Sequence, residues 1–226
     1  MQDILVQDLD FNLSFNNFNP EDIQVDDTVN AVFVVDVSPS VSGYIHELNH
    51  ALNDFAVTMQ QSHIADRLLV SVIEFNENVK VKSGFQPINQ VHDFQFKPYG
   101  GGTALYDATL MGLKLATDYR NNLEASGVTT KTLLFIITDG EDNRSKNQAN
   151  VVNKMLNQIL GNERNAFSFV TVLFGVGDSA SFTKAKQEMG IQHLAQVGAT
   201  GTEIKKMIGF ISRSISSSVA NTNVNF

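Results

Sequence analysis

Three short polar motifs carry side chains that together could bind a metal ion. They are Asp36-Val37-Ser38-Pro39-Ser40, Thr103 behind three glycines, and Asp139-Gly140. Two carboxylates and three hydroxyls form a set of oxygen donors, which suits Mg²⁺ or Mn²⁺ better than Zn²⁺. Two negative charges roughly balance a divalent cation and leave it able to attract another acidic group. The candidate ligands of Mg²⁺, with Mn²⁺ or Ca²⁺ as substitutes, are Asp36, Ser38, Ser40, Thr103 and Asp139.

Each motif taken alone also has an ordinary structural interpretation. Asp and Ser after a strand usually cap a helix or form a turn, and Asp139-Gly140 is a turn signal. In an extended backbone, residues 36, 38 and 40 would point to one side. Thr103 needs its flexible glycine loop to reach the same point. Because the motifs lie at or near the carboxyl ends of predicted strands, where open parallel sheets bind ligands, we favour one shared site.

Alternating strands and amphipathic helices are expected to position these motifs, as in an α/β protein with a mainly parallel sheet. Apolar runs at 31–37, 68–75, 132–138 and 167–174 predict strands, and the runs at 31–37 and 132–138 suit the centre of the sheet. The three residues between 68–75 and a strand at 79–85 fit a tight hairpin, which makes that edge antiparallel. A small edge strand is expected at 193–197. Helices are predicted at about 44–60, 105–121, 151–160, 182–189 and 204–215.

Acidic residues are concentrated at the start of the chain. Residues 1–29 hold seven acids and no Lys or Arg, whereas the other 17 acids face 16 basic residues, so −7 of the net charge of −8 lies in this segment. We expect an acidic extension at 1–29, a single domain at 30–215 and a flexible Ser- and Asn-rich tail at 216–226. The sequence shows no basic stripe that would neutralise phosphates, which argues against nucleic acid as a partner.

Composition also restricts the class of protein. The chain has no cysteine, which excludes disulfides and thiolate metal sites. No apolar run approaches the roughly 18 residues that a membrane-spanning helix needs. The first residues are acidic where a signal peptide would carry Lys or Arg. We therefore expect a cytoplasmic protein with no membrane partner.

The motifs D-V-S-P-S, G-G-T and T-D-G-E-D, in this order, resemble the metal-ion-dependent adhesion site of von Willebrand factor type A domains. The similarity covers about residues 30–215. Within it, S-V-I-E-F at 71–75 and G-G-G-T-A-L-Y-D-A at 100–108 look most like intracellular bacterial members, such as those of tellurite-resistance operons. One departure is Pro39, where many members have glycine. Proline fixes its own φ and pushes Ser38 toward an extended conformation, which is compatible with the motif.

The resemblance implies a doubly wound, Rossmann-like sheet of six mainly parallel strands, with one antiparallel edge strand and helices on both faces. It also implies that the five candidate ligands hold Mg²⁺ directly or through water. The implied function is that of an interaction module and not of an enzyme: a protein partner presents Glu or Asp to the metal. By analogy, the setting would be a bacterial or phage stress, defence or chaperone-type assembly, in which an ATPase would be a further component. A surface adhesin is the alternative within the same class.

A second motif points to a different chemistry. His46-Glu47-Leu48-Asn49-His50 matches H-E-x-x-H, in which two histidines bind Zn²⁺ and the glutamate is the general base of a peptidase. On a helical wheel, however, His46, Glu47 and His50 lie opposite the apolar face of this helix. A zinc site would need a third ligand and a covering element, and the sequence identifies neither. A zinc metallopeptidase is therefore the less favoured alternative.

Overall fold

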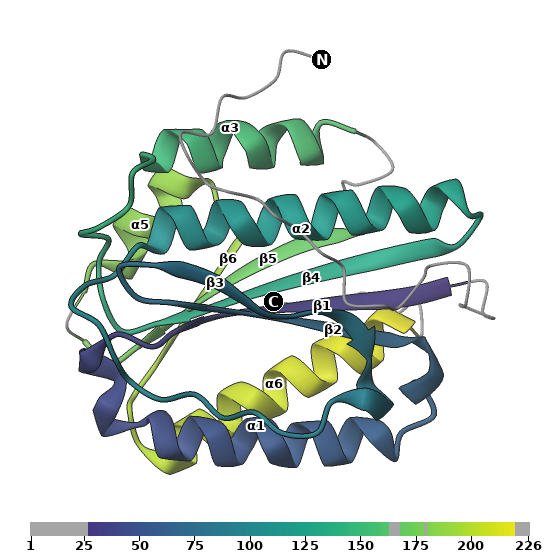
Figure 1. Cartoon of the computed structure of the whole chain (residues 1–226), viewed down its shortest axis with the longest axis horizontal. Coiled ribbons are helices and arrows are strands. Elements are labelled where there is room, and N and C mark those ends of the chain that lie inside the picture. Colours follow the sequence, from purple (N-terminus) through teal and green to yellow (C-terminus); the bar gives the residue numbers. More distant parts are fainter. Residues whose placement is uncertain (1–26, 163–167, 179, 220–226) are drawn as a thin grey trace.

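The computed structural model describes residues 27–162, 168–178 and 180–219, which form a six-stranded sheet between two layers of helices (Figure 1). The sheet order is β3-β2-β1-β4-β5-β6. β3 pairs antiparallel with β2, and every other neighbouring pair is parallel. This confirms the predicted α/β class, the six strands and the antiparallel edge. The strands are β1 (Asp27–Asp36), β2 (Leu68–Phe75), β3 (Val79–Pro87), β4 (Thr129–Thr138), β5 (Phe169–Val176) and β6 (His193–Val197).

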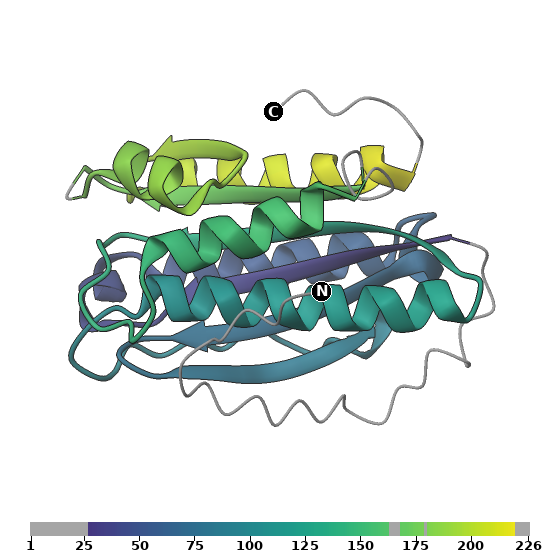
Figure 2. The ribbon, with the colours of Figure 1, turned by 90° about the horizontal axis from the view of Figure 1, so that it is seen from above.

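Helices cover both faces of the sheet, as predicted. α1 (Ile45–Gln60) and α6 (Gly201–Val219) lie on one face, and α2 (Leu105–Ala125), α3 (Ala149–Leu160) and α5 (Phe182–Met189) lie on the other. Figure 2 shows β6, α5 and α6 together at one edge of the sheet and β3 at the opposite edge. Short 3₁₀ helices occur at Pro39–Gly43 (η2), Ala65–Arg67 (η3) and Ile88–Gln90 (η4). None of the helices in the described residues is long and apolar enough to cross a bilayer.

The core is divided in two by the sheet because successive strand residues point to opposite faces. Phe33 and Val35 of β1 join the cluster under α1 and α6, whereas Val32 and Val34 join the cluster under α2 and α3. Phe33 is fully buried, and its ring centroid lies 5.5 Å from that of Phe55, 5.8 Å from that of Phe94 and 5.6 Å from that of Phe135. These contacts join α1 to the central strands β1 and β4, so they hold in place the two strands whose carboxyl ends lead to Asp36 and Asp139.

Among the element boundaries that differ from the sequence predictions, two concern the ends of the predicted domain. β1 begins at Asp27, so the last three residues of the predicted extension belong to the sheet. α6 continues to Val219, so the predicted start of the tail at Ser216 is four residues early. In this part of α6 the hydroxyls of Ser216 and Ser218 donate to the carbonyls of Ser212 and Ser214, four residues back, and Ser214 and Ser218 are buried. A serine-rich sequence can therefore remain helical where it packs against the sheet. The rest of the extension and of the tail lies outside the described residues.

Candidate metal centre

The carboxyl ends of β1 and β4 bring Asp36 and Asp139 to the same edge of the sheet. Asp36 is the last residue of β1, and Asp139 directly follows β4. The two strands are parallel neighbours in which Val35 is opposite Ile137, so their ends reach the rim together. In Figure 1 this rim is on the left, where β1 leads into η2. We call the five predicted ligands at this edge the rim site: Asp36, Ser38, Ser40, Thr103 and Asp139.

Asp36 is buried and is held by hydrogen bonds to both of its carboxylate oxygens. The Ser38 backbone N–H donates to Oδ1 at 2.8 Å, and the Thr138 hydroxyl donates to Oδ2 at 2.6 Å. Burial raises the pKa of Asp36, and the nearby charge of Asp139 raises it further, although the hydrogen bonds from Thr138 and Ser38 lower it. Burial likewise raises the pKa of Asp139, against a hydrogen bond from Ser40. A cation beside both carboxylates would favour their charged forms.

A chain of hydrogen bonds joins three of the rim residues. The hydroxyl oxygens of Ser38 and Ser40 are 2.9 Å apart, and the Ser40 hydroxyl donates to Asp139 Oδ1 at 2.7 Å. Ser38 has extended backbone angles, φ −63° and ψ 161°, which agree with the restriction that Pro39 imposes. The expectation that residues 36–40 form one extended run is nevertheless wrong. Pro39–Gly43 is a 3₁₀ helix, so Ser40 reaches the site from its first turn, where proline is well accommodated.

Thr103 is buried and lies beside the turn that carries Asp139. Its backbone N–H donates to Asn143 Oδ1 at 2.9 Å, and its carbonyl accepts from the backbone N–H groups of Asn143 and Arg144 at 3.0 and 3.2 Å. A Cβ placed on Gly140 would lie 3.6 Å from the Thr103 hydroxyl oxygen. The structure therefore brings all five predicted residues to one place, with Thr103 on a loop that is tied to the loop after β4.

The conformation of the glycine loop, residues 100–102, is restricted by the residues that pack against it. Gly100 has a φ of +87°, which glycine adopts without strain. A Cβ on Gly102 would lie 2.3 Å from Arg144 Cγ, so the approach of this loop to the loop after β4 requires glycine. The Gly101 N–H donates to Glu77 Oε2 at 2.6 Å, and this bond is the main cause of a lowered pKa of Glu77. The β2–β3 hairpin thus supports the rim, a role that its sequence does not indicate.

Thr138 and Asp107 also support the site, although neither was predicted from the sequence. Asp107 is buried in the first turn of α2; its Oδ2 accepts from the Lys146 N–H at 2.8 Å, and its Oδ1 accepts from the Asn147 backbone and side-chain amides at 3.0 and 2.8 Å. It thereby anchors the loop after Asp139. An acid in the first turn of a helix is common for electrostatic reasons, so its type alone gave no signal. The hydrogen bond from Thr138 to Asp36 spans 102 positions and cannot be inferred from local pattern.

Tyr44 is a further residue of the rim that was not predicted. It follows η2, is 3% exposed, and within the described residues its hydroxyl has no hydrogen-bond partner. Burial raises its pKa, and the charges of Asp139 and Asp36 raise it further, so the phenol lies within electrostatic reach of both. A buried hydroxyl without a partner costs about 1–3 kcal/mol, which an added ligand shell would relieve. The oxygen donors and this hydroxyl together fit a hard divalent cation such as Mg²⁺.

The H-E-x-x-H residues have a different environment. His46 and His50 are exposed on α1, and His50 Nδ1 lies 3.1 Å from Asp54 Oδ2. In the described ranges there is no cluster of three or more His, Cys, Asp or Glu side chains placed to hold a metal ion. The rim site, with two carboxylates and three hydroxyls, is not a cluster of that kind. The zinc alternative therefore has no identified third ligand of this type.

Comparison with sequence families gives one match over most of the chain. The family model of the von Willebrand factor type A domain matches residues 30–199, which include the whole rim site. A search of curated proteins gave no match.

Solved structures share the architecture at low sequence identity. Proximal thread matrix protein 1 from the mussel byssus is 16% identical with a TM-score of 0.54, and the match covers 84% of this chain and 47% of that one. The pilus adhesin SpaC from Lactobacillus rhamnosus GG, in its open conformation, is 12% identical with a TM-score of 0.58 over 84% of this chain and 30% of that one. The vWF domain of the pilus tip protein Mfa5 from Porphyromonas gingivalis is 10% identical with a TM-score of 0.55 over 89% and 99%. The chain spans less than half of the first two proteins, and these likenesses show the fold alone.

Proposed function

Since the chain belongs to the von Willebrand factor type A domain family, whose domains are modules of protein–protein interaction or adhesion, we propose that its rim site holds Mg²⁺ and binds a protein partner through it. The observation that carries this proposal is the run of oxygen atoms from Ser38 through Ser40 to Asp139, at 2.9 and 2.7 Å, next to the buried carboxylate of Asp36. Such a set of donors suits Mg²⁺.

The side chains of the rim site differ in solvent exposure, which separates an inner side of the site from the side that a partner can reach. Asp36, Ser38 and Thr103 are buried and fixed by neighbours, so they would form the rigid inner side of the site. Ser40 is exposed and Asp139 is partly exposed, so a partner can approach from their side. When bound, Mg²⁺ supplies an electrophilic position for an acidic side chain of that partner. A partner that presents Glu or Asp, an assembly that includes an ATPase, and a cytoplasmic location are parts of the same proposal.

The interaction is tested by affinity capture from the cells that make the protein, with the partners quantified by mass spectrometry. The full chain in Mg²⁺ should retain at least one protein that is lost both with a chelator and with Asp139→Ala. His50→Ala, a change at an exposed position of α1, should retain it. If the same proteins are captured with and without metal and by Asp139→Ala, metal-dependent binding of a partner is wrong.

A surface adhesin is the second candidate, because SpaC, a pilus adhesin, has this fold. At 12% identity that likeness shows fold and not function. Fractionation of the producing cells separates the two candidates, since a purely cytosolic protein excludes an adhesin and surface exposure excludes a cytoplasmic assembly.

Tyr44→Phe is expected to weaken Mg²⁺ binding by about tenfold, the lower end of the range for groups that surround metal ligands. The change removes one buried hydroxyl that lies within electrostatic reach of Asp36 and Asp139. The stability of the metal-free protein should be unchanged or slightly higher, because the hydroxyl makes no hydrogen bond there within the described residues. Calorimetric titration and thermal unfolding measure the two effects.

Tyr119→Phe is the matched control for this prediction. Tyr119 is also buried, but it stacks on Phe85 with ring centroids 4.2 Å apart, and burial alone raises its pKa. Removal of the Tyr119 hydroxyl should leave the affinity for Mg²⁺ unchanged. Equal affinities of the wild type and Tyr44→Phe would show that Tyr44 has no part in the site.

A further inference from the structure

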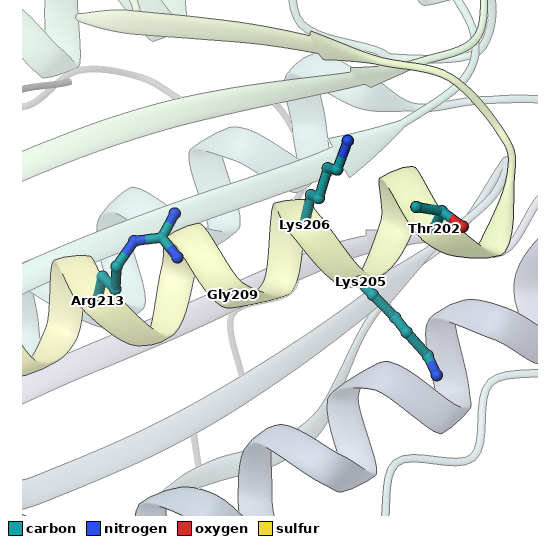
Figure 3. A pocket seen from close by; sticks show the side chains of 5 residues that line it. All are labelled: Thr202, Lys205, Lys206, Gly209 and Arg213. Carbon is teal, nitrogen blue, oxygen red and sulfur yellow. The ribbon is translucent and has the colours of Figure 1, made fainter.

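The outer side of α6 presents a strip of positive charge. Lys205, Lys206 and Arg213 are exposed there, and Gly209 lies between them without a side chain. In Figure 3, Lys206 and Arg213 point to one side of the helix, whereas Lys205 points toward α1. Together with Thr202 these residues line a shallow hollow of about 370 Å³. We call this surface the α6 basic face: Thr202, Lys205, Lys206, Gly209 and Arg213.

The three cations of this face are not paired with acids of the described residues, unlike several cations on other helices. Lys114, Arg120 and Lys184 each pair with an acid four residues further along their own helix. No ion pair joins Lys205, Lys206 or Arg213 to an acid within the described parts of the chain. The acid of the first turn of α6, Glu203, accepts a hydrogen bond from the Thr200 hydroxyl at 2.9 Å. The positive charge of this face is therefore available to a ligand of opposite sign.

A segment of opposite charge is present in the same chain. Residues 1–26 contain six acids and no Lys or Arg, so they carry −6 of the net charge of −8. Apolar residues lie among the acids, which gives the segment groups that can cover a hollow as well as pair with cations. The six acids are Asp3, Asp8, Asp10, Glu21, Asp22 and Asp26.

The segment joins the described domain at the end of the sheet where α6 ends. β1 begins at Asp27, and Val29 is opposite Lys131 of β4, whose Nζ donates to the carbonyl of Ser218 near the end of α6. Figure 1 shows the start of β1 and the end of α6 on the same side. A chain of 26 residues spans up to about 85 Å when extended, whereas the 19 residues of α6 extend about 28 Å. The acidic segment can therefore reach every residue of the α6 basic face.

We propose that the acidic segment 1–26 docks on the α6 basic face of the same molecule. Exposed charge pairs are individually weak, but a short tether gives an effective concentration in the millimolar range, at which several weak contacts act together. The contact depends on charge, so it weakens when salt shortens the range of electrostatic attraction. Docking covers the side of α6 that faces away from the sheet, and it does not involve the rim site.

Zero-length carbodiimide cross-linking of the full chain tests the proposal, because this reagent joins carboxylates to lysine amines that are in contact. Equal amounts of ¹⁴N- and ¹⁵N-labelled protein are mixed, so that links within one molecule are distinguished from links between two. We expect links from the acids of segment 1–26 to Lys205 and Lys206 within one isotope, about tenfold more frequent than links to Lys154, as tethering would produce. Lys154 is an exposed lysine of α3, on the other face of the sheet. At about 1 M NaCl the excess should disappear.

A charge-reversed variant provides the second arm. Lys206→Glu with Arg213→Glu leaves Lys205 as the reporting amine, and links to Lys205 should fall about tenfold relative to the wild type. Lys154→Glu, the control, should leave them unchanged. Thermal unfolding verifies that the variants are folded, which is expected because the altered side chains are exposed. The proposal is overturned if links to Lys205 and Lys206 are no more frequent than links to Lys154, if they join mixed isotopes, or if the charge reversal leaves them unchanged.

Discussion

Asp36→Asn is expected to abolish Mg²⁺ binding. The same change is expected to stabilise the metal-free protein. The variant keeps the size of the side chain but removes one of the two negative charges of the rim site. If Asp36 is a Mg²⁺ ligand, as we propose, its loss should weaken Mg²⁺ binding by more than the roughly 100-fold upper range found for groups that surround the ligands. In the metal-free protein the carboxylate is buried near Asp139, and both features raise its pKa, so its charged form is disfavoured in the folded state. A neutral amide removes that cost.

Thermal unfolding of the wild type and Asp36→Asn, each with a chelator and with excess Mg²⁺, measures both effects. Mg²⁺ should raise the melting temperature of the wild type and leave that of the variant unchanged, because a ligand stabilises the state that binds it. With the chelator, the variant should melt at the same or a higher temperature. A variant that is less stable without metal, yet is still stabilised by Mg²⁺, would show that Asp36 is a structural residue and not a ligand.

Phe33→Ala is expected to reduce the free energy of unfolding by about 3–5 kcal/mol, the range for truncating a buried phenylalanine. Its ring is fully buried in the centre of β1 and contacts Phe55 of α1, Phe94 and Phe135 of β4. The cavity would therefore loosen the strands that end in Asp36 and Asp139. Urea unfolding followed by circular dichroism gives the value.

Val57→Ala is the control for this stability prediction because Val57 is 53% exposed on α1. It should change the free energy of unfolding by less than about 0.5 kcal/mol. If Phe33→Ala costs less than about 1 kcal/mol, the described packing at the centre of the sheet is wrong.

Sequence patterns were sufficient for most of the fold because its signals are local. The runs at 31–37 and 132–138 are mostly apolar because both faces of β1 and β4 are covered by helices. The hairpin between β2 and β3 needs few residues, so its antiparallel pairing follows from loop length. The five rim residues could be grouped in advance because parallel strands end at a common edge, as β1 and β4 do.

The remaining features depend on contacts between distant residues or on competition between local preferences. Asp107 has a type that is common in the first turn of a helix and Tyr44 a type that is common in partly apolar cores, so their roles appear only when the rim is assembled. Ser40 reaches Asp139 through a 3₁₀ turn because Pro39 suits the first position of a helix, which alternation in an extended strand does not anticipate. The end of α6 was misplaced because a serine-rich sequence is a poor helix signal until tertiary packing supports it.

The most direct test of the account is calorimetric titration of Mg²⁺, Mn²⁺ and Zn²⁺ into chelator-treated wild type, Asp139→Ala and His50→Ala. Asp139 accepts the hydrogen bond from Ser40 at the rim, whereas His50 is exposed on α1, so the two variants separate the candidate sites. We expect saturable binding of Mg²⁺ or Mn²⁺ that is lost in Asp139→Ala and kept in His50→Ala. Zinc binding that is lost only in His50→Ala, with no binding of Mg²⁺ or Mn²⁺ by the wild type, would contradict the account and favour a zinc site on α1.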